Sequence, residues 1–436
     1  QFSTATTTGG ITTVTPVLFN GTPLSFRPDV SNQYNQVDFG LSPSAITPQG
    51  DMNLIAKDFK LPASYKVSLG FDKKFGKGWT LSMDGLFTKN IYEVDWKNVN
   101  IINPNTTISG PDTRKVYSTN GNINSIRLSY RPGAVGSAQA NPYNSVILIQ
   151  NTDGAKGYAF NFTTAIDKQT RTGFSFNGSY TYGNSQVNNE GSSSVNLSNW
   201  RFGAESVVGR NFVTRSTSDY DLKHRVFAYV SKKFTYANKH MATTISFVYN
   251  GQSGNPYSYV YNGNAFVGDI AAGNDLAYIP ASRGEMDNMV FVTRLPTSAN
   301  PAANAADITL QKDDYEVFIQ SDKYLSKNRG RFADRNGARL PFTNILDAAI
   351  QQDFMIKSGN TNHTLSVRFD ISNFTNLLSK TAGRQYFLTN DQFPLLNFRG
   401  LTNTPATNTP TYQFFKPITS VGNISDGVNT FNSSRW

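Results

Sequence analysis

The chain has 436 residues, of which 38% are hydrophobic, 13% aromatic and 16% charged, and no stretch approaches the roughly 18 consecutive apolar residues of a transmembrane helix. It contains no cysteine, which excludes disulfides and thiolate metal sites. Its net charge of +10 is spread along the chain without basic runs or a nucleic-acid-binding motif. We therefore expect no nucleic-acid partner. Anionic lipid headgroups are an alternative partner for the positive charge.

The first clear element is a β-hairpin. In residues 65–75 one parity is mostly apolar, including Tyr65, Leu69 and Phe71, while the other is polar. Successive strand side chains point to opposite faces, so this strand has one apolar and one polar face. A short turn at 76–78 leads into a second alternating strand that begins at Trp79. The pattern predicts two paired strands of amphipathic character.

Three further hairpins follow in the chain. Their strands are predicted at 158–166 with 174–182, at 222–236 with 241–249, and at 344–354 with a return strand ending near 372. Each hairpin turn is a few residues long. The segments that separate the hairpins are long and polar, at about 92–156, 183–221, 250–343 and 377–430.

The contrast between short turns and long connections is typical of transmembrane barrels, which have short periplasmic turns and long extracellular loops. Tyr65 and Phe75 lie ten positions apart on the apolar face, which at about 3.3 Å per residue and a tilt near 40° spans roughly the 25 Å lipid-facing band. We therefore predict an all-β fold, an antiparallel transmembrane barrel. A soluble β-sandwich with an aromatic core is the alternative, although its second face would be unusually polar. One short surface helix is predicted at 313–325, inside the third long loop.

Five stretches resemble the Oar-like TonB-dependent transporters, found mainly in Bacteroidetes. They are SDYDLKHR at 218–225, YNGQSGNPYSY at 249–259, NDLAYIP at 274–280, YLSKNRGRFADRNGARLPF at 324–342 and DISNFTNLL at 370–378. The resemblance is strong over about 218–380 and diffuse before it. It implies a 22-stranded outer-membrane barrel that is closed by an N-terminal plug and energised through TonB. The implied function is import of an unidentified large ligand, such as a peptide, glycan or chelate.

The chain departs from that family pattern at both ends. It begins at Gln1 without a leader, plug domain, TonB box or carboxypeptidase-regulatory-like domain, and it stops at Trp436 before the expected last strand. We interpret residues 1–436 as the C-terminal part of the barrel. Expected partners are outer-membrane lipid, TonB acting through a missing N-terminal region, and the plug of the full-length chain. A surface lipoprotein partner is left open.

No catalytic site is expected, because His224, His240 and His363 are scattered and no cysteine is available for a zinc cluster. Tyr257, Tyr259 and Tyr261 in the third loop are candidate ligand contacts, since aromatic rings with polar handles suit recognition at a wet surface. The same tyrosines fit an aromatic girdle at the barrel rim equally well.

Charged residues on the polar strand faces are expected to line the lumen; they are Lys66, Asp72, Asp84, Arg368 and Asp370. Lateral ion pairing and contact with a plug are favoured for them over direct substrate contact. No cofactor is expected, apart from a candidate Ca²⁺ site at Asp269, Asn274 and Asp275, which lacks the spacing of a calcium loop. Two other functions stay open: a passive porin-like channel, and a surface adhesion or structural barrel.

Overall fold

The computed structural model describes residues 51–119, 143–262, 266–269, 273–296, 300–359, 361–379, 382–402 and 408–415, together with short strands within 3–50, 122–123 and 428–431. The chain divides into two compact units. The smaller unit comprises Gln1–Met52 and Ser129–Ser145. In it, β1 (Ser3–Thr8) pairs with β2 (Ile11–Pro16), and β3 (Leu18–Phe19) pairs with β4 (Thr22–Pro23), both antiparallel. The larger unit carries all the features described below.

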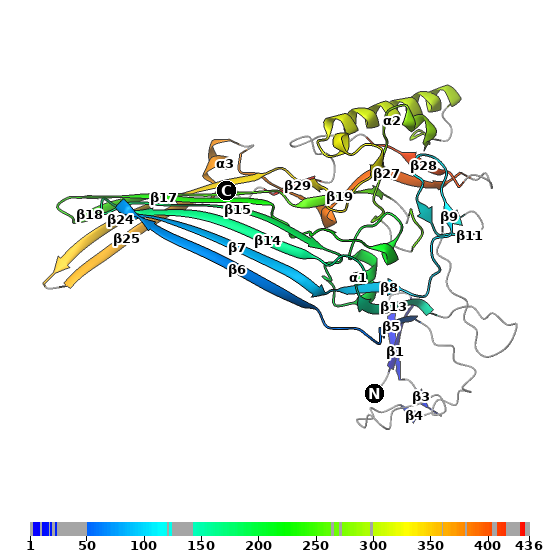
Figure 1. The fold of residues 1–436 in the computed structure, drawn as a ribbon, viewed down its shortest axis with the longest axis horizontal. Helices are drawn as coiled ribbons and strands as arrows, with labels where there is room; N and C mark the ends of the chain where they lie inside the picture. The colour runs from blue at the N-terminus through cyan, green and yellow to red at the C-terminus, as the bar shows by residue number, and fades with distance from the viewer. Residues whose placement is uncertain are drawn as a thin grey trace. The chain divides into compact units, whose positions relative to one another are not determined.

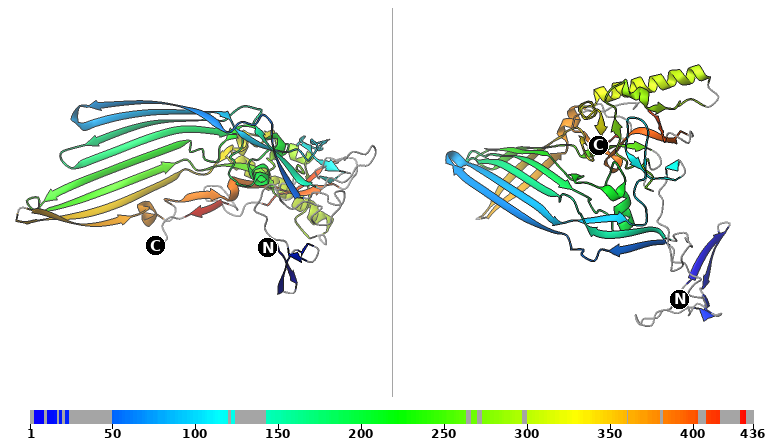
Figure 2. Two further views of the ribbon diagram at one scale, coloured as in Figure 1. Left: turned by 90° about the horizontal axis from the view of Figure 1, so that it is seen from below. Right: turned by 45° about the vertical axis from the view of Figure 1, so that its right-hand side comes forward.

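A sheet of nine strands dominates the larger unit (Figures 1 and 2). Eight of them are long and lie in the order β25-β24-β18-β17-β15-β14-β7-β6, while the short β16 (Ser216–Thr217) pairs with β15. The long strands are β6 (Ala63–Phe75), β7 (Trp79–Tyr92), β14 (Tyr158–Gln169), β15 (Phe174–Val187), β17 (His224–Tyr236), β18 (Met241–Gln252), β24 (Thr343–Ser358) and β25 (Thr361–Ile371). Every long neighbour pair is antiparallel, and all four predicted hairpins are confirmed.

The hairpin turns are tight and use left-handed backbone. Gly76–Gly78 forms a single 3₁₀ turn in which Lys77 has φ 65°. Gly78 has φ +78°, and a Cβ there would lie 2.5 Å from the carbonyl oxygen of Gln169 at the end of β14. Only glycine accepts both the conformation and this approach, which explains the glycine next to Trp79.

The sheet is open at both sides. Among the described residues, β6 pairs only with β7 and β25 pairs only with β24. The antiparallel all-β architecture predicted from the sequence is thus confirmed, whereas a closed ring of 22 strands goes beyond the eight long strands seen here. Closing such a ring requires further strands against these two edges.

The strand register carries the alternation across the whole sheet. Leu69 lies opposite Gly85 and Phe87 opposite Phe160, while Asp84 lies opposite both Gly70 and Thr163. One face is therefore apolar from β6 to β25, and the other is polar. The apolar face is not covered in the described structure: Leu69 is 79% exposed and Phe369 is 63% exposed. An exposed apolar face of this extent is typical of a surface that contacts lipid.

The predicted loops are folded rather than open. We call the described residues within 93–119, 146–157, 188–223, 253–342 and 382–415 the loop assembly. It contains β8 (Val94–Asn98), most of β13 (Tyr143–Asn151), α1 (Asn196–Phe202), β19 (Pro256–Asn262), α2 (Pro301–Ser321), β27 (Gln392–Leu401) and β28 (Pro410–Gln413). Shorter elements complete it: β9 (Thr106–Thr107), β10 (Lys115–Val116), β11 (Ser118–Thr119), η3 (Arg210–Phe212), β20 (Tyr278–Ile279), η4 (Glu285–Asn288), β21 (Val290–Phe291), η5 (Leu325–Lys327), β22 (Arg331–Phe332), β23 (Ala338–Arg339), β26 (Gln385–Leu388) and η6 (Thr389–Asp391).

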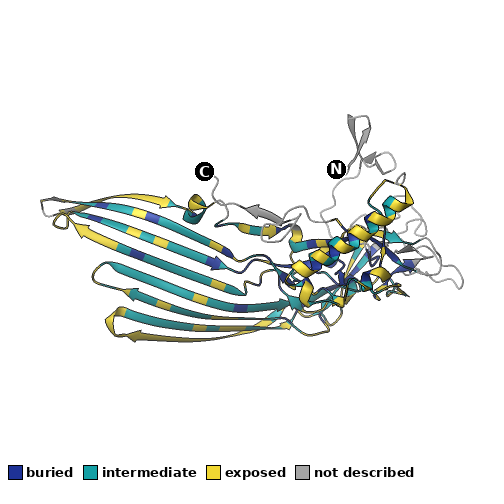
Figure 3. Ribbon diagram, turned by 90° about the horizontal axis from the view of Figure 1, so that it is seen from above, coloured by how far each residue is buried: buried dark blue, intermediate teal, exposed yellow. Residues whose placement is uncertain are grey.

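Buried residues concentrate in the loop assembly, as Figure 3 shows, whereas the long strands are mostly intermediate or exposed. Its hydrophobic core includes Trp96, Trp200, Phe266 and Phe393. The third predicted loop, expected to be polar, supplies much of this core. This part of the core was not predicted, because its apolar residues are dispersed among Asn, Asp and Gly in the sequence.

Helix α2 is longer than the sequence analysis predicted. It begins after Asn300, whose side chain accepts a hydrogen bond of 2.6 Å from the backbone N–H of Ala303, and Pro301 occupies the first turn. The prediction of a short helix starting at 313 was therefore wrong about its start and length. Its buried stripe is Asp307, Gln311, Tyr315 and Ile319. Since the first two members are polar, apolar periodicity became visible only from Tyr315.

Two helices were not predicted, α1 and the short α3 (Phe374–Leu378). None of the helices in the described ranges combines the length and the hydropathy that a membrane span needs.

Candidate functional site

Four of the five stretches that carry the family resemblance meet in space. Residues 274–280 pair with 324–342 through β20 and β22, where Tyr278 lies opposite Phe332. Two backbone hydrogen bonds of 2.8 Å extend the contact, from the N–H of Gly330 to Ile279 and from that of Ala333 to Ala277. The stretch 324–342 thus lies against a segment about fifty positions earlier in the chain.

Asn336 connects three of these stretches. Its backbone has φ 57°, the left-handed region that Asn tolerates better than most residues. Its N–H donates to Oγ of Ser258 at 2.9 Å, and its Nδ2 donates to Oδ1 of Asp219 at 2.6 Å and to the carbonyl of Thr217 at 2.8 Å. Asn336 is 3% exposed, so these bonds replace water inside the assembly.

Three arginines hold the same stretch in place. Arg339 pairs with the carboxylate of Asp221. Arg335 donates to the carbonyl of Val187 at 2.9 Å, at the end of β15. Arg329 grips Glu316 on α2 with two hydrogen bonds of 2.7 and 3.1 Å. Arginine suits these positions because its planar fork makes two directed bonds at once.

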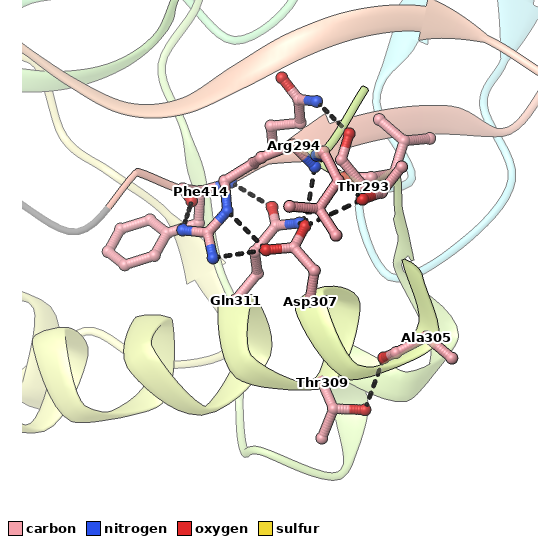
Figure 4. Close-up of polar contacts among 10 residues, drawn as sticks. Thr293, Arg294, Ala305, Asp307, Thr309, Gln311 and Phe414 are labelled. Atoms are coloured by element: carbon pink, nitrogen blue, oxygen red, sulfur yellow. Dashed lines mark hydrogen bonds and ion pairs between the residues drawn. The ribbon is translucent and has the colours of Figure 1, made fainter. Parts of the chain in front are cut away.

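A second polar cluster holds the first half of α2 (Figure 4). Arg294 donates to Asp307 through its backbone N–H, Nε and Nη2, at 2.7 to 3.0 Å. Gln311 donates to Asp307 at 2.9 Å and accepts from the N–H of Phe414 at 2.9 Å. Burial raises the pKa of Asp307, but the hydrogen bonds from Arg294 outweigh it and hold that pKa below its usual value. This cluster was not predicted from the sequence, because its members are widely separated in the chain.

A cavity of about 780 Å³ opens beside the end of α2. Four segments form its walls: the residue before β17, the start of β19, the end of α2 with the turn that follows, and the approach to β24. The lining residues are Lys223, Tyr257, Ser321, Asp322, Lys323, Tyr324, Lys327, Asn328, Gly337, Ala338, Arg339, Leu340, Pro341 and Phe342. The volume lies within the range of small-ligand pockets.

The tyrosines predicted as ligand contacts lie in the core. Tyr257, Tyr259 and Tyr261 are each 2% exposed, so their expected position at a wet surface was wrong. The hydroxyl of Tyr259 donates to Asp322 at 2.8 Å, and that of Tyr261 donates to Asp112 at 2.9 Å. Burial raises the pKa of all three phenols. Tyr257 alone of the three lines the cavity.

The residues predicted to face the lumen lie on one face. Lys66 and Asp72 share the polar parity of β6, Asp84 that of β7, and Arg368 and Asp370 that of β25. Asp72 accepts a hydrogen bond of 2.5 Å from Ser82 on the next strand. Arg368 donates from Nε to Asp370 at 2.8 Å, a lateral pair of the kind expected. Contact of these residues with a plug or a substrate stays a prediction.

The candidate calcium ligands bond to the protein instead. Asp269 accepts from the N–H of Arg210 at 2.7 Å, and Asp275 accepts from that of Phe266 at 2.7 Å. The side chain of Asn274 donates to the carbonyl of Arg201 at 3.1 Å. Within the described residues, no group of three or more acidic, histidine or cysteine side chains is arranged to hold a metal ion.

The carboxyls of Asp269 and Asp275 are almost fully buried, and each affects the charge of the other. Burial, together with the neighbouring Asp269, raises the pKa of Asp275 to about 7. Burial also lowers the pKa of Arg210 to about 10. The carboxyl of Asp269 orders the backbone at Arg210, and that of Asp275 orders the backbone at 266–267, which is a structural explanation for the acidic motif.

The basic residues of the cavity were not singled out from the sequence. Lys223, Lys327 and Arg339 belong to the stretches that resemble the transporter family, and Lys323 directly precedes the longest of them. The one feature of the sequence that pointed to these residues was therefore the resemblance to the transporter family. It identified the segments but gave no reason to group cations from different segments.

Three comparisons with known proteins bear on identity. No curated protein matches the chain. The crystal structure of the outer membrane transporter YddB from Escherichia coli aligns with 79% of this chain and 33% of that chain, at 11% sequence identity and a TM-score of 0.33. This chain therefore spans about a third of the length of that structure. A family model described as the outer membrane beta barrel domain matches residues 1–394. The amphipathic antiparallel sheet agrees with this match. The chain therefore belongs to the outer membrane β-barrel domain family and is a protein of the outer membrane.

Proposed function

We propose that this chain is barrel and loop structure of a TonB-dependent outer-membrane transporter. In this proposal a large ligand, such as a peptide, glycan or chelate, binds the loop assembly and then passes through the lumen without chemical conversion. One observation carries the proposal: the amphipathic sheet continues into a loop assembly that has its own hydrophobic core and a cavity of ligand size. A passive pore does not require a folded binding body of this kind at the strand ends.

The proposed partners follow from the two faces of the sheet. The apolar face, with Leu69 and Phe369, would contact outer-membrane lipid. The polar face, with Lys66, Asp72 and Arg368, would line the lumen and meet the plug of the full-length protein. TonB would act through the region that carries the plug, and a surface lipoprotein could cover the loop assembly. The five motif stretches support the Oar-like assignment by resemblance.

The native polypeptide tests this proposal directly. We would purify it from outer membranes, measure its mass and map peptides before Gln1 and after Trp436. A chain much longer than 436 residues with a plug-like N-terminal region supports the transporter. A native chain that ends near this length, with ion conductance in planar bilayers, would identify a porin. Neither plug nor conductance, with loop-dependent cell adhesion, would identify an adhesion barrel.

A further inference from the structure

We propose that the cavity beside the end of α2 binds an anionic ligand, one that carries carboxylate or phosphate groups. This inference deepens the proposed transport function by naming the chemistry of the cargo. It rests on that function for its biological meaning, whereas its binding test does not require transport.

The side chains that line the cavity are mainly cationic where they are charged. Four cationic side chains line the cavity, Lys223, Lys323, Lys327 and Arg339, against the single carboxylate of Asp322. Cations brought together in one concave site raise the local concentration of anions and favour their binding. The four come from three separate segments of the chain, so this grouping exists only in the fold.

The one carboxylate is already engaged by the protein. Oδ2 of Asp322 accepts from the hydroxyl of Tyr259 at 2.8 Å. Its Oδ1 accepts from the backbone N–H groups of Tyr324 at 2.9 Å and Leu325 at 2.7 Å. These bonds direct the charge of Asp322 towards the core and the following turn, and so reduce its competition for the lysines.

The lysines differ from Arg339 in this respect. Arg339 is paired with Asp221. For Lys223, Lys323 and Lys327, no ion pair with another described residue is formed. Three ammonium groups in one cavity repel one another, and an anion among them relieves that repulsion while accepting their hydrogen bonds.

The cavity also has aromatic side chains in its walls, which would contact an uncharged part of the ligand. Tyr324 and Phe342 contribute aromatic surface, whereas Tyr257 is almost fully buried in the wall. The Tyr324 ring is held by stacking on Tyr259 at 5.9 Å, and its hydroxyl accepts from the N–H of Asp334 at 2.7 Å. A volume of about 780 Å³ with fixed aromatic rings suits a ligand of several linked units that carries its anionic groups on a ring or chain.

The test measures binding to the full-length native protein in detergent by calorimetry. The probes are trigalacturonate for carboxylates, tripolyphosphate for phosphates, and neutral maltotriose as a size-matched control. We expect one or both anions to bind and maltotriose not to bind. Binding of trigalacturonate alone assigns a carboxylate cargo, and binding of tripolyphosphate alone assigns a phosphate source, free or on a lipid headgroup. Failure of both anions to bind overturns the inference.

Variants locate the site. Lys323 and Lys327 are exposed, so K323Q/K327Q should fold like the wild type, which an unchanged thermal transition would confirm. Each lost lysine should weaken anion binding about tenfold, the effect of one charge-assisted hydrogen bond. The matched control is K115Q, at an exposed lysine of β10 that does not line the cavity, and its affinity should equal that of the wild type. Anion binding that is the same in all three proteins would overturn the assignment to this cavity.

The two proposals fail separately. Lysine-dependent anion binding by a protein that has no plug and no energised uptake leaves the site standing and removes the transporter. TonB-dependent uptake by a protein that binds neither anion leaves the transporter standing and removes the anionic site.

Discussion

Nδ2 of Asn336 donates a hydrogen bond of 2.6 Å to Oδ1 of Asp219, and this contact joins two loops 117 positions apart in the chain. The same residue carries a left-handed backbone at φ 57°. Asparagine is one of few residues that tolerate this conformation, and its amide supplies the donor as well. The two requirements together account for Asn at this position of the loop assembly.

Replacing Asn336 should weaken the loop assembly measurably. Asn336→Ala loses three side-chain hydrogen bonds at a buried site, to Asp219, Thr217 and Ser258, and places a residue without an amide in the left-handed region, which should cost about 2–4 kcal/mol. Pulse proteolysis of the loops measures this as a change in the free energy of local unfolding. The matched control is Asn390→Ala, at φ 55° on an exposed residue, which carries the backbone effect alone. Equal effects in the two variants would contradict a role for the Asp219 contact.

The docking of α2 should depend on the carboxylate of Asp307. Asp307→Asn weakens the charge-assisted bonds from Arg294, which should lower the local stability of α2 by about 2 kcal/mol, measured by hydrogen exchange in residues 301–321. The pKa of Asp307 is lowered in the folded state, so its contribution is present above the unfolded pKa near 3.8 and is lost as pH falls through the folded value. In the Asp307→Asn variant, the local stability of α2 should therefore no longer fall at acidic pH through this group.

A surface pair provides the control for α2. Asp313→Asn breaks the exposed ion pair with Arg283, and exposed pairs contribute only about 0–1 kcal/mol. Exchange rates in α2 should stay near those of the wild type. If Asp313→Asn opened α2 as much as Asp307→Asn, the cluster around Arg294 would not be the anchor.

The fold was predicted where period-two alternation is local, and the candidate site was not. Ser68 and Leu69 already separate the polar and apolar faces in sequence, so the hairpins follow from neighbouring residues alone. The cavity requires Lys223 and Lys327 to approach across about a hundred positions, which no local pattern encodes. The tyrosines near 259 were placed at the surface because aromatic residues with hydroxyls suit both a wet rim and a polar core, and only burial distinguishes the two.

A buried carboxyl should make the loop assembly less stable as pH rises. The pKa of Asp275 is raised from 3.8 to about 7, mainly by burial, so the folded state keeps a proton that the unfolded state has already lost. Stability should be highest near pH 4 and decline until about pH 7, in thermal unfolding of the loop assembly. Asp275→Asn should reduce that decline, while the part due to Asp95 and Asp391, whose pKa values burial raises to about 6, should remain. Asp287→Asn is the control: hydrogen bonds from Arg283 and Lys312 lower the pKa of Asp287, so its titration lies below this window and the decline should persist.

Lipid contact can be assigned to one face of the sheet with two neighbouring residues of β6. Leu69 lies on the apolar face and Ser68 on the polar face, and both are exposed in the described structure. Leu69→Arg would place a charge in the hydrocarbon, which costs about 2–4 kcal/mol at the middle of a barrel wall, whereas Ser68→Arg would place it on the lumenal side. Reversible urea unfolding of the full-length protein in lipid vesicles measures the difference. Leu69→Arg should be destabilised by that amount and Ser68→Arg by less than about 1 kcal/mol. The reverse order would mean that the polar face meets lipid, and equal effects would mean that β6 does not contact the bilayer at this depth.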